Sequence, residues 1–266
     1  MKAIRSRDNA LVKHWHALAH SARDRRKSGQ TLLDGAHLLR AALDAGCPFE
    51  ALIVSESGLE QAEISGLCAA LPPGVQRYLL TDALFRHVSP VDTPAGVLAV
   101  VEPAAVLVDE GSEILRPESL IALDAVQDPG NLGTILRTAA AAGIRRALLG
   151  EGCAHAWSPR VLRAGMGAHF ALRIEEGLDL PARLAGYPGV RIATALGAGA
   201  RPLYDLDLRG PVAWLFGAEG KGLSRELLAC ADQRAVIPML GAMESLNVGA
   251  AAAVCLFEQA RQLRSR

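Results

Sequence analysis

The second half of the chain alternates apolar segments of strand length with segments of helical periodicity. Helices are expected between most of the apolar segments, including one at 131–143 and a last one at roughly 245–263. The apolar segments predict strands at 120–126, 146–150, 170–174, 190–196, 212–216 and 235–239. This alternation predicts a parallel sheet with helices on both faces. Ligands of such sheets bind beyond the carboxyl ends of the strands, so the loops at that edge are the first candidates for a functional site.

A shorter α/β pattern precedes this region. It predicts helices at 30–45 and 59–71 and strands at 51–54, 75–80 and 96–101. The stretch that follows contains two Pro, a Gly and the acidic run DEGSE, a composition typical of a linker. The 266 residues are enough for two domains of ordinary size. We therefore predict a first domain over residues 1–104, a linker over 105–119 and a second domain over 120–266.

Charge is balanced over the whole chain, with 28 basic and 28 acidic side chains, but it is unevenly distributed. Residues 1–40 contain nine Lys or Arg against three Asp. This excess includes Arg23, Arg25, Arg26 and Lys27, which lie close together in the sequence. Such a segment indicates either a surface that binds phosphate groups or the solvated face of a helix, and charge alone does not separate the two.

Composition also disfavours several classes of protein. Half of the residues are hydrophobic, which excludes a disordered chain. No uncharged apolar run reaches the ~20 residues that a membrane span needs. The N-terminal segment lacks the apolar core of a secretion signal. The five Cys are scattered singly, and no carboxylate or thiol cluster accompanies the His residues to complete a metal shell. We therefore expect a cytoplasmic protein with no metal and no membrane partner.

Three loops beyond the predicted strands contain the least ordinary residues. The first has the sequence QDPGNLGTILRTA (127–139). Its DPG is expected to form a turn, and Asn131 stands where the following helix would be capped. Gly133 and Arg137 are four residues apart, so Arg137 is expected to extend over Gly133 toward the space above the sheet. Taken alone, a capping Asn and a surface Arg explain this segment better than a site does.

The second loop has the sequence FGAEGKGLSREL (216–227), in which three Gly flank Glu219 and Lys221. Ser224 is suited to cap the helix that follows. The Gly spacing lacks the order of both the dinucleotide fingerprint and the phosphate loop, which disfavours a nucleotide-dependent oxidoreductase on a Rossmann sheet. So many Gly residues favour a close approach of the backbone to some ligand.

The third loop has the sequence IPMLGAMESLNVGAAAAVCLF (237–257). A polar cluster of Glu244, Ser245 and Asn247 precedes an Ala-rich helix. One face of that helix carries small apolar residues, which would let another segment pack closely. An ordinary core helix explains this face but not the polar residues at its start.

These loops resemble the three motifs of the SpoU family (also called the TrmH family) of RNA ribose 2'-O-methyltransferases in the SPOUT superfamily. NLGTILRTA resembles the first motif, FGAEGKGLS the second and IPMLGAMESLNVGAAAA the third. A further segment, SPRVLRAGMGAHF (158–170), also resembles part of the family, and the order matches over roughly 120–263. Segments 6–18 and 32–46 are similar to the substrate-binding domain that many members carry.

The resemblance implies an α/β fold in which a small α/β RNA-binding domain precedes a parallel-sheet SPOUT domain with a deep trefoil knot. It also implies a homodimer and S-adenosylmethionine as the cofactor, held by the knot loops. By motif alignment, the cofactor-binding residues are Ala195, Gly217, Ile237 and Leu246. The functional polar positions of the family fall on Asn131, Arg137, Glu219, Ser245 and Asn247.

Two residues depart from the family pattern. Ala218 stands where the second motif usually has Asn, and Gly249 stands where the third usually has Ser. Neither change removes any of the five polar residues. The intact polar set disfavours the alternative reading, an RNA-binding protein that keeps this fold without catalysis.

The activity implied is transfer of a methyl group from S-adenosylmethionine to a ribose 2'-hydroxyl of structured RNA. Ribosomal RNA is favoured over transfer RNA because the first domain resembles one common in members that act on ribosomal RNA. We expect Arg137 to hold the ribose hydroxyl or its phosphate as a charged clamp, oriented by Asn131 and Glu219. RNA phosphates are expected to contact the basic N-terminal segment and a second group of Arg residues, namely Arg145, Arg146, Arg160, Arg163 and Arg173.

Overall fold

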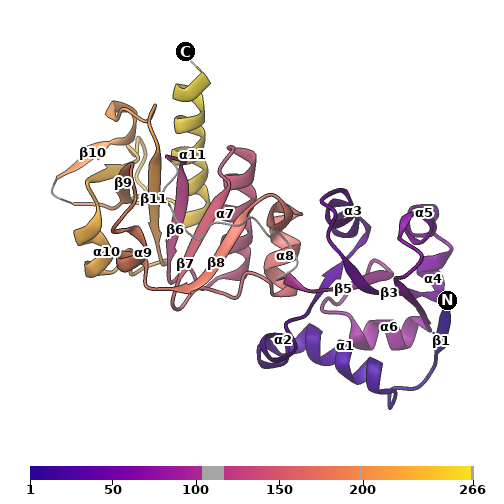
Figure 1. The fold of residues 1–266 in the computed structure, drawn as a ribbon. Helices are drawn as coiled ribbons and strands as arrows, with labels where there is room; N and C mark the ends of the chain where they lie inside the picture. Colours follow the sequence, from indigo (N-terminus) through magenta and orange to yellow (C-terminus); the bar gives the residue numbers. More distant parts are fainter. Residues whose placement is uncertain (104–116, 198, 265–266) are drawn as a thin grey trace. The chain divides into compact units, whose positions relative to one another are not determined.

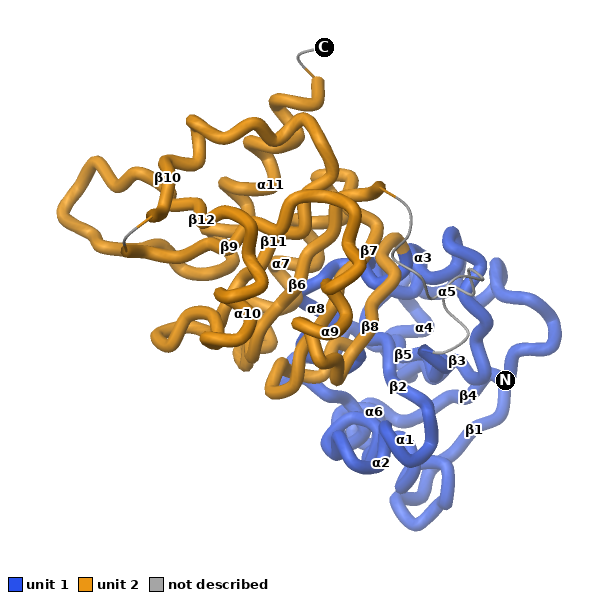
Figure 2. The backbone as a smooth tube through the Cα atoms, turned by 60° about the vertical axis from the view of Figure 1, so that its left-hand side comes forward, with its two compact units in different colours: residues 1–108, 157–170 blue, residues 109–156, 171–266 orange. Residues whose placement is uncertain are grey.

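The computed structural model describes residues 1–103, 117–197 and 199–264, and the chain divides into two compact units (Figure 2). The first unit contains Met1–Val108 and Trp157–Phe170, and the second contains Asp109–Ala156 and Ala171–Arg266. The linker predicted over 105–119 falls mostly on residues 104–116, outside the described ranges. The domain boundaries at 104 and 120 therefore stay predictions.

A five-stranded mixed sheet forms the centre of the first unit, with the strand order β1-β4-β3-β5-β2. Its strands are β1 (Lys2–Ile4), β2 (Thr31–Asp34), β3 (Phe49–Ser55), β4 (Gln76–Leu80) and β5 (Val97–Val101). The strands predicted near 51–54, 75–80 and 96–101 are thus confirmed. The helices of this unit that precede residue 100 are α1 (Ala10–His20), α2 (Ala22–Ser28), α3 (Ala36–Asp44), α4 (Glu56–Leu59), α5 (Ala62–Ala70) and α6 (Asp82–Val88) (Figure 1).

The helix predicted at 30–45 is wrong over its first part. Residues 31–34 form β2, which pairs antiparallel with β5, and the helix α3 begins only at Ala36. Gly35, with a φ of 93°, separates the two elements. Leu32 and Leu33 are fully buried, and a short run of buried residues does not distinguish a strand from a helix by periodicity. The helix predicted at 59–71 is likewise two shorter helices, α4 and α5.

One segment from the middle of the chain packs with the first unit. It contains α8 (Pro159–Gly165) and the short helix η2 (Ala168–Phe170). The hydroxyl of Thr31 donates a buried hydrogen bond of 2.7 Å to the carbonyl of Trp157. Arg163 of α8 lies 3.9 Å from the carboxylate of Asp34 in β2. The sequence pattern alone assigns this segment to the second domain, because hydrogen bonds between distant residues leave no trace in periodicity.

The second unit contains a seven-stranded sheet with the order β10-β12-β9-β11-β6-β7-β8. Every strand pair in it is parallel. The strands are β6 (Leu120–Asp124), β7 (Arg146–Gly150), β8 (Arg173–Leu178), β9 (Val190–Thr194), β10 (Ala200–Pro202), β11 (Val212–Gly217) and β12 (Gln233–Val236). The helices are α7 (Pro129–Ala141), α9 (Leu180–Leu184), α10 (Arg225–Cys230), α11 (Val248–Arg264) and the short η3 (Leu203–Asp205).

Helices cover both faces of this sheet, as the alternating pattern predicts (Figure 1). Leu215 of β11 packs in one core cluster with Leu180 of α9 and Leu227 of α10. The neighbouring Trp214 points to the other face, where its indole donates a 2.8 Å hydrogen bond to Gln259 of α11. Several predicted boundaries are wrong by three or four residues: β8 spans 173–178 where 170–174 was predicted, β12 ends at 236 and not 239, and α11 begins at 248 and not 245. The trefoil knot stays a prediction.

Two further properties bear on the expected partners. Within the described chain, none of the helices combines the length and apolar character that crossing a bilayer requires. In the same ranges, no group of three or more His, Cys, Asp or Glu side chains is placed to hold a metal ion.

Candidate active site

The predicted site residues follow strands that are neighbours in the sheet. In the order β12-β9-β11-β6, all four strands are parallel, so their carboxyl ends meet at one edge. Ala195 follows β9, Gly217 ends β11, Ile237 follows β12, and Asn131 lies beyond β6 in the first turn of α7. The three loops that are far apart in sequence are therefore brought together at the edge where ligands of such sheets bind.

The start of α7 differs from the prediction in one respect that matters for the site. Asp128, not Asn131, caps the helix: its carboxylate accepts the backbone N–H of Asn131 at 2.7 Å. Asn131 is thus a residue of the helix itself, and its side chain does not cap the helix and can bind other groups. Asp128 suits this role because a carboxylate at the N-cap also interacts favourably with the helix dipole.

The side chains of Glu219, Asn131 and Asn247 form a continuous hydrogen-bonded chain. The amide of Asn131 donates to the carboxylate of Glu219, which lies in the loop after β11. The amide of Asn247 donates to the carbonyl oxygen of Asn131 at 3.0 Å. Asn247 in turn accepts the backbone N–H of Gly249 at 2.9 Å and so caps α11. One member of each motif loop is therefore joined in a single polar network.

The other two predicted polar residues are not joined to this network. Arg137 lies on the exposed side of α7, and among the described residues it has no hydrogen-bond or ion-pair partner. Its expected orientation by Asn131 and Glu219 is therefore not seen as a direct contact. Ser245 is exposed in the loop before α11. Both side chains are accessible to a ligand.

The four predicted cofactor-binding residues present small or apolar groups at the same edge. Gly217 is buried, and a Cβ there would lie 2.2 Å from the backbone carbon of Gly222, so no side chain fits. Ala195 and Ile237 are half-buried, and Leu246 is 41% exposed. Residues 239–246 form no backbone hydrogen bond with the other described residues, so their N–H and C=O groups are available to a ligand.

Most of the predicted RNA-binding residues are exposed, which suits contacts with phosphates. Exposed side chains are those of Arg23, Arg26, Lys27, Arg145, Arg160 and Arg163. Arg25 departs from this pattern: it is 8% exposed, and its guanidinium donates to the carbonyls of Leu18 at 2.7 Å and Ala19 at 3.4 Å. It therefore holds the end of α1 and is not placed to meet a phosphate.

Three members of the second Arg group are engaged in ion pairs: Arg163 with Asp34, as described above, and Arg146 and Arg173 with Glu side chains. Arg146 is buried, with one guanidinium nitrogen 3.3 Å from Glu175 and another 3.3 Å from Glu118. Arg173 lies 3.4 Å from the same Glu175 carboxylate. Arg146 and Arg173 therefore have carboxylate partners, and the expectation that they contact RNA phosphates is weakened.

Two residues at this edge escaped sequence reasoning. Asp124, the last residue of β6, accepts the backbone N–H of Ser224 at 2.7 Å, and Asp128 caps α7. Asp128 was already visible as part of a turn, and the Pro129 directly after it is the sequence signal of a helix cap at Asp128. No sequence signal marks Asp124, because its partner is 100 residues away.

A nearby thiol has no catalytic character. Cys153 donates a hydrogen bond of 3.2 Å to the carbonyl of Leu123. Burial raises the pKa of Cys153 to about 11. The thiol is therefore protonated at neutral pH and is a poor nucleophile.

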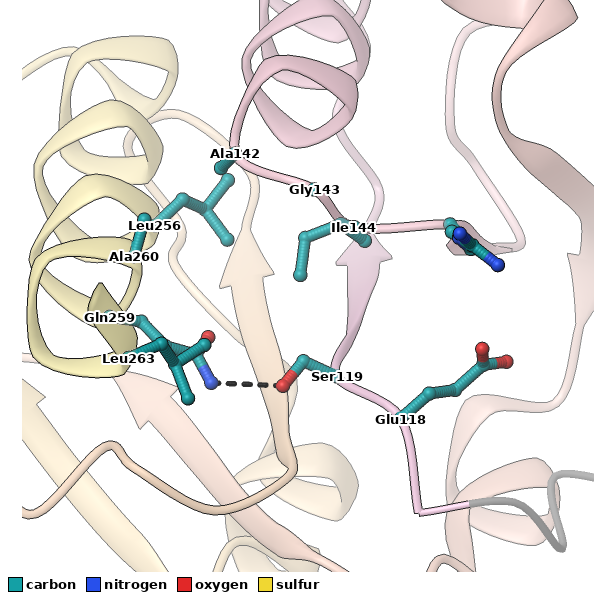
Figure 3. A pocket seen from close by; sticks show the side chains of 10 residues that line it. Glu118, Ser119, Ala142, Gly143, Ile144, Leu256, Gln259, Ala260 and Leu263 are labelled. Atoms are coloured by element: carbon teal, nitrogen blue, oxygen red, sulfur yellow. Dashed lines mark hydrogen bonds between the residues drawn. The ribbon is translucent and has the colours of Figure 1, made fainter. Parts of the chain in front are cut away.

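A cavity of about 310 Å³ lies away from this edge, where β6 and β7 begin (Figure 3). It is bordered by the end of α7, the last turns of α11 and the residues just before β6. Gln259 donates a 2.9 Å hydrogen bond to Ser119 across it. Of the predicted site residues only Arg145 lines it, so this cavity and the polar network are separate features.

Comparison with known proteins identifies related families. The model of the SpoU rRNA Methylase family matches residues 118–257, and that of the MRM3-like substrate binding domain matches residues 9–99. The 23S rRNA (guanosine(2553)-2'-O)-methyltransferase RlmP of Bacillus subtilis (strain 168) is 34% identical over 261 residues, covering 97% of this chain and 98% of the relative.

Solved structures agree with these matches. An AdoMet-bound rRNA methyltransferase from Sinorhizobium meliloti has a TM-score of 0.83 at 31% identity and is covered over 98% of both chains. The SpoU methyltransferase AviRb from Streptomyces viridochromogenes, in complex with AdoMet, has a TM-score of 0.82 at 26% identity, with 97% of this chain and 100% of that chain covered.

Proposed function

The chain belongs to the SpoU rRNA methylase family, and from this premise we propose that it transfers a methyl group from S-adenosylmethionine to a ribose 2'-hydroxyl of ribosomal RNA. The observation that carries the proposal is the hydrogen-bonded chain of Glu219, Asn131 and Asn247 at the carboxyl edge of the sheet. A protein that only bound RNA would need no such network joining three distant motifs, because phosphate binding requires only exposed basic groups.

The residues present suit the cofactor. S-adenosylmethionine supplies a methyl group that is already activated by its sulfonium. The backbone groups of 239–246, which form no backbone hydrogen bond with the other described residues, and the small residues Ala195 and Gly217 allow a ligand to lie against the backbone. The exposed side chain of Leu246 and the half-buried Ile237 offer apolar surface beside them. We propose these four residues as the cofactor-binding set.

The protein's own task is then to hold a ribose hydroxyl directly behind this methyl group and to stabilise the charge that develops on the hydroxyl oxygen. We propose that Arg137 binds the hydroxyl or its neighbouring phosphate, because its five donors are free among the described residues. A guanidinium stays protonated in proteins, so we propose a role as charged clamp, with a substrate phosphate or a water accepting the hydroxyl proton. Alignment alone contributes several kcal/mol, up to ~7–11 for ideal geometry.

We propose that Ser245 and the Glu219–Asn131–Asn247 network shape the place where the ribose lies. Glu219 has one described partner, the amide of Asn131, and its side chain is exposed at the tip of its loop. Asn131 is in contact on both sides, so its amide is fixed in orientation. A fixed polar network limits the ways in which a sugar can lie beside it, which serves positioning more than affinity.

The exposed basic residues of the first unit are proposed to bind RNA phosphates. Arg23, Arg26 and Lys27 lie on the short helix α2, and Arg160 and Arg163 lie on α8. The match of residues 9–99 to a substrate-binding domain supports this assignment. A homodimer and a cytoplasmic location are further proposals, and sedimentation of the purified protein checks the first.

Two measurements test the function. The first is calorimetric titration with S-adenosylhomocysteine, for which we expect binding at one site per chain. The second is mapping of 2'-O-methylated riboses in ribosomal RNA from a deletion strain, with and without the purified protein. One ribose that loses its methyl group in the strain and regains it in vitro supports the proposal. Full methylation of the ribosomal RNA in the deletion strain would reject it.

A further inference from the structure

At its far end, the loop that carries Glu219 is held by the buried side chain of Leu223 and by one carboxylate, that of Asp124. Asp124 is the last residue of β6 and stands opposite Gly217, the last residue of β11, in the parallel register. Its Oδ2 atom accepts the backbone N–H of Ser224 at 2.7 Å. The loop 218–223 therefore begins beside the backbone of Asp124. It ends at Ser224, which is bonded to the side chain of the same Asp124.

Within the loop, the chain folds back on itself. Ala218 donates to the carbonyl of Gly222 at 3.1 Å, and Gly222 donates to the carbonyl of Ala218 at 2.9 Å. Gly220 and Gly222 have φ values of 82° and 69°, a region that residues with side chains rarely adopt. These bonds place Glu219 at the tip, but they are internal to the loop and do not set its direction relative to α7.

The backbone next to Asp124 is in an unusual conformation. Ala125 has a φ of 52°, one of two residues other than Gly with a positive φ in the described chain. The turn is braced from the neighbouring loop, where Ala154 donates to the carbonyl of Val126 at 2.8 Å and Cys153 donates to that of Leu123 at 3.2 Å. Uncommon backbone conformations persist where the surroundings enforce them, and they gather at functional sites.

We propose that Asp124 is a positioning residue for Glu219. Its carboxylate holds Ser224 and thereby directs the loop 218–223 so that Glu219 meets the amide of Asn131. Hydrogen bonds from backbone N–H groups to a carboxylate are among the stronger ones, and this one sets the direction of a loop end that Leu223 already holds against the core. The expected effect of Asp124 on catalysis rests on the proposed function, whereas its restraint of the loop does not.

Amide hydrogen exchange tests the restraint without any activity. In Asp124→Ala we expect the segment 218–224 to exchange at least about tenfold faster than in the wild type, while α7 keeps its rate. Asp124→Asn retains a carbonyl oxygen as acceptor and is expected to restore most of the protection. Asp179→Ala is the matched control, because Asp179 accepts a backbone N–H of α9 at 3.2 Å in the same manner. Unchanged exchange of 218–224 in Asp124→Ala would overturn the proposal.

A double-mutant cycle tests the route through Glu219. At saturating RNA, Asp124→Ala is expected to lower the single-turnover rate of methyl transfer by about 10- to 100-fold, with KM for RNA changed less than about twofold. In a Glu219→Ala background the same substitution is expected to cost less than about threefold, because residues acting as a unit are not additive. An equal loss in both backgrounds would show that Asp124 acts independently of Glu219 and would refute the assignment.

The two experiments separate this inference from the proposed function. If the wild type transferred no methyl group to ribosomal RNA, the function would be rejected, and hydrogen exchange would still decide whether Asp124 holds the loop. If the wild type were active and Asp124→Ala kept its full rate, the function would stand and the positioning role would fall.

Discussion

The side-chain amide of Asn131 donates a hydrogen bond to the carboxylate of Glu219, which lies 88 residues further along the chain. Asn131 can do so because Asp128 has taken over the capping of α7. On its other side, Asn131 accepts a hydrogen bond of 3.0 Å from Asn247. Three short motifs thus meet at one residue, which makes Asn131 the most sensitive position of the candidate site.

Substitution of Asn131 is expected to impair catalysis more than stability. Asn131→Asp removes the donor to Glu219 and places two carboxylates in contact; because Glu219 is exposed, the repulsion breaks the network more than it destabilises the fold. We expect a fall of about 10- to 100-fold in the methyl transfer rate, measured by single-turnover assays. Asn9→Asp is the matched control, since Asn9 caps α1 and Asp serves equally well there. A near-native rate for Asn131→Asp would contradict a role for the network.

Arg137→Lys is expected to lower kcat by at least about tenfold, because an ammonium is a point charge and lacks the planar fork of a guanidinium. S-adenosylhomocysteine affinity is expected to stay the same, since the proposed cofactor residues lie in other loops. A pH–rate profile of both proteins completes the measurement. Near-native rates with Lys would show that the guanidinium geometry is not used. Arg209→Lys is the control, because Arg209 pairs with Asp207 on the surface.

Leu246→Arg is expected to abolish binding of S-adenosylhomocysteine while leaving the melting temperature within a few degrees. Leu246 is 41% exposed, so the longer charged side chain fits without disturbing the core. Isothermal calorimetry measures the first effect and thermal unfolding the second. Leu240→Arg, at a fully exposed position of the same loop, is expected to bind normally. Equal affinity in the wild type and Leu246→Arg would remove Leu246 from the cofactor-binding set.

The basic segment of α2 yields two opposite expectations from adjacent residues. Charge reversal of the exposed pair, Arg26→Glu with Lys27→Glu, is expected to weaken RNA binding and to reduce the slope of log affinity against log salt by about 2. Arg25→Ala removes buried hydrogen bonds to the end of α1, so it is expected to lower stability by about 1–3 kcal/mol.

Filter binding at several salt concentrations and thermal unfolding distinguish these two effects. For Arg25→Ala we expect the wild-type salt slope together with a lower melting temperature. A reduced slope in Arg25→Ala would show that its guanidinium reaches RNA in spite of its burial. An unchanged slope in the double charge reversal would exclude α2 from the RNA interface.

Asp34→Asn is expected to stabilise the protein at pH 8. Burial raises the pKa of Asp34 to about 6, and the nearby Arg163 only partly offsets this effect. The folded state therefore favours the protonated carboxyl, and stability is lost as pH rises from the unfolded value near 4 through 6. Removing the charge is expected to raise the free energy of unfolding by about 1–3 kcal/mol above that pH range and by little at pH 4.

Urea denaturation of both proteins at pH 4 and pH 8 measures the difference. The Oδ1 atom of Asp34 is buried without a hydrogen-bond partner among the described residues, which makes the ionised form costly. A variant that is less stable than the wild type at pH 8 would show that the ion pair with Arg163 outweighs desolvation. Asp232→Asn provides a contrast, since Arg191 lowers the pKa of Asp232 and the substitution is expected to destabilise.

The sequence by itself determined the class of fold and the place of the candidate site. The period of the apolar residues distinguishes buried parallel strands from amphipathic helices, and parallel strands place the following loops at one edge. The polar site residues could be predicted because they lie in these loops and because the loops resemble the motifs of a known family. Local chemistry also marks helix caps, although Asp128 and not Asn131 fills that role.

Tertiary structure decided which of these residues touch. The hydrogen bonds that Glu219 accepts from Asn131 and Asp124 accepts from Ser224 join residues about a hundred positions apart, and nothing in local periodicity records such contacts. Burial was equally invisible: Arg25 and Arg26 are neighbours in one basic run, yet only Arg25 is turned inward. A run of charges reveals composition, whereas the direction of each side chain follows from the helix phase and from what packs against it.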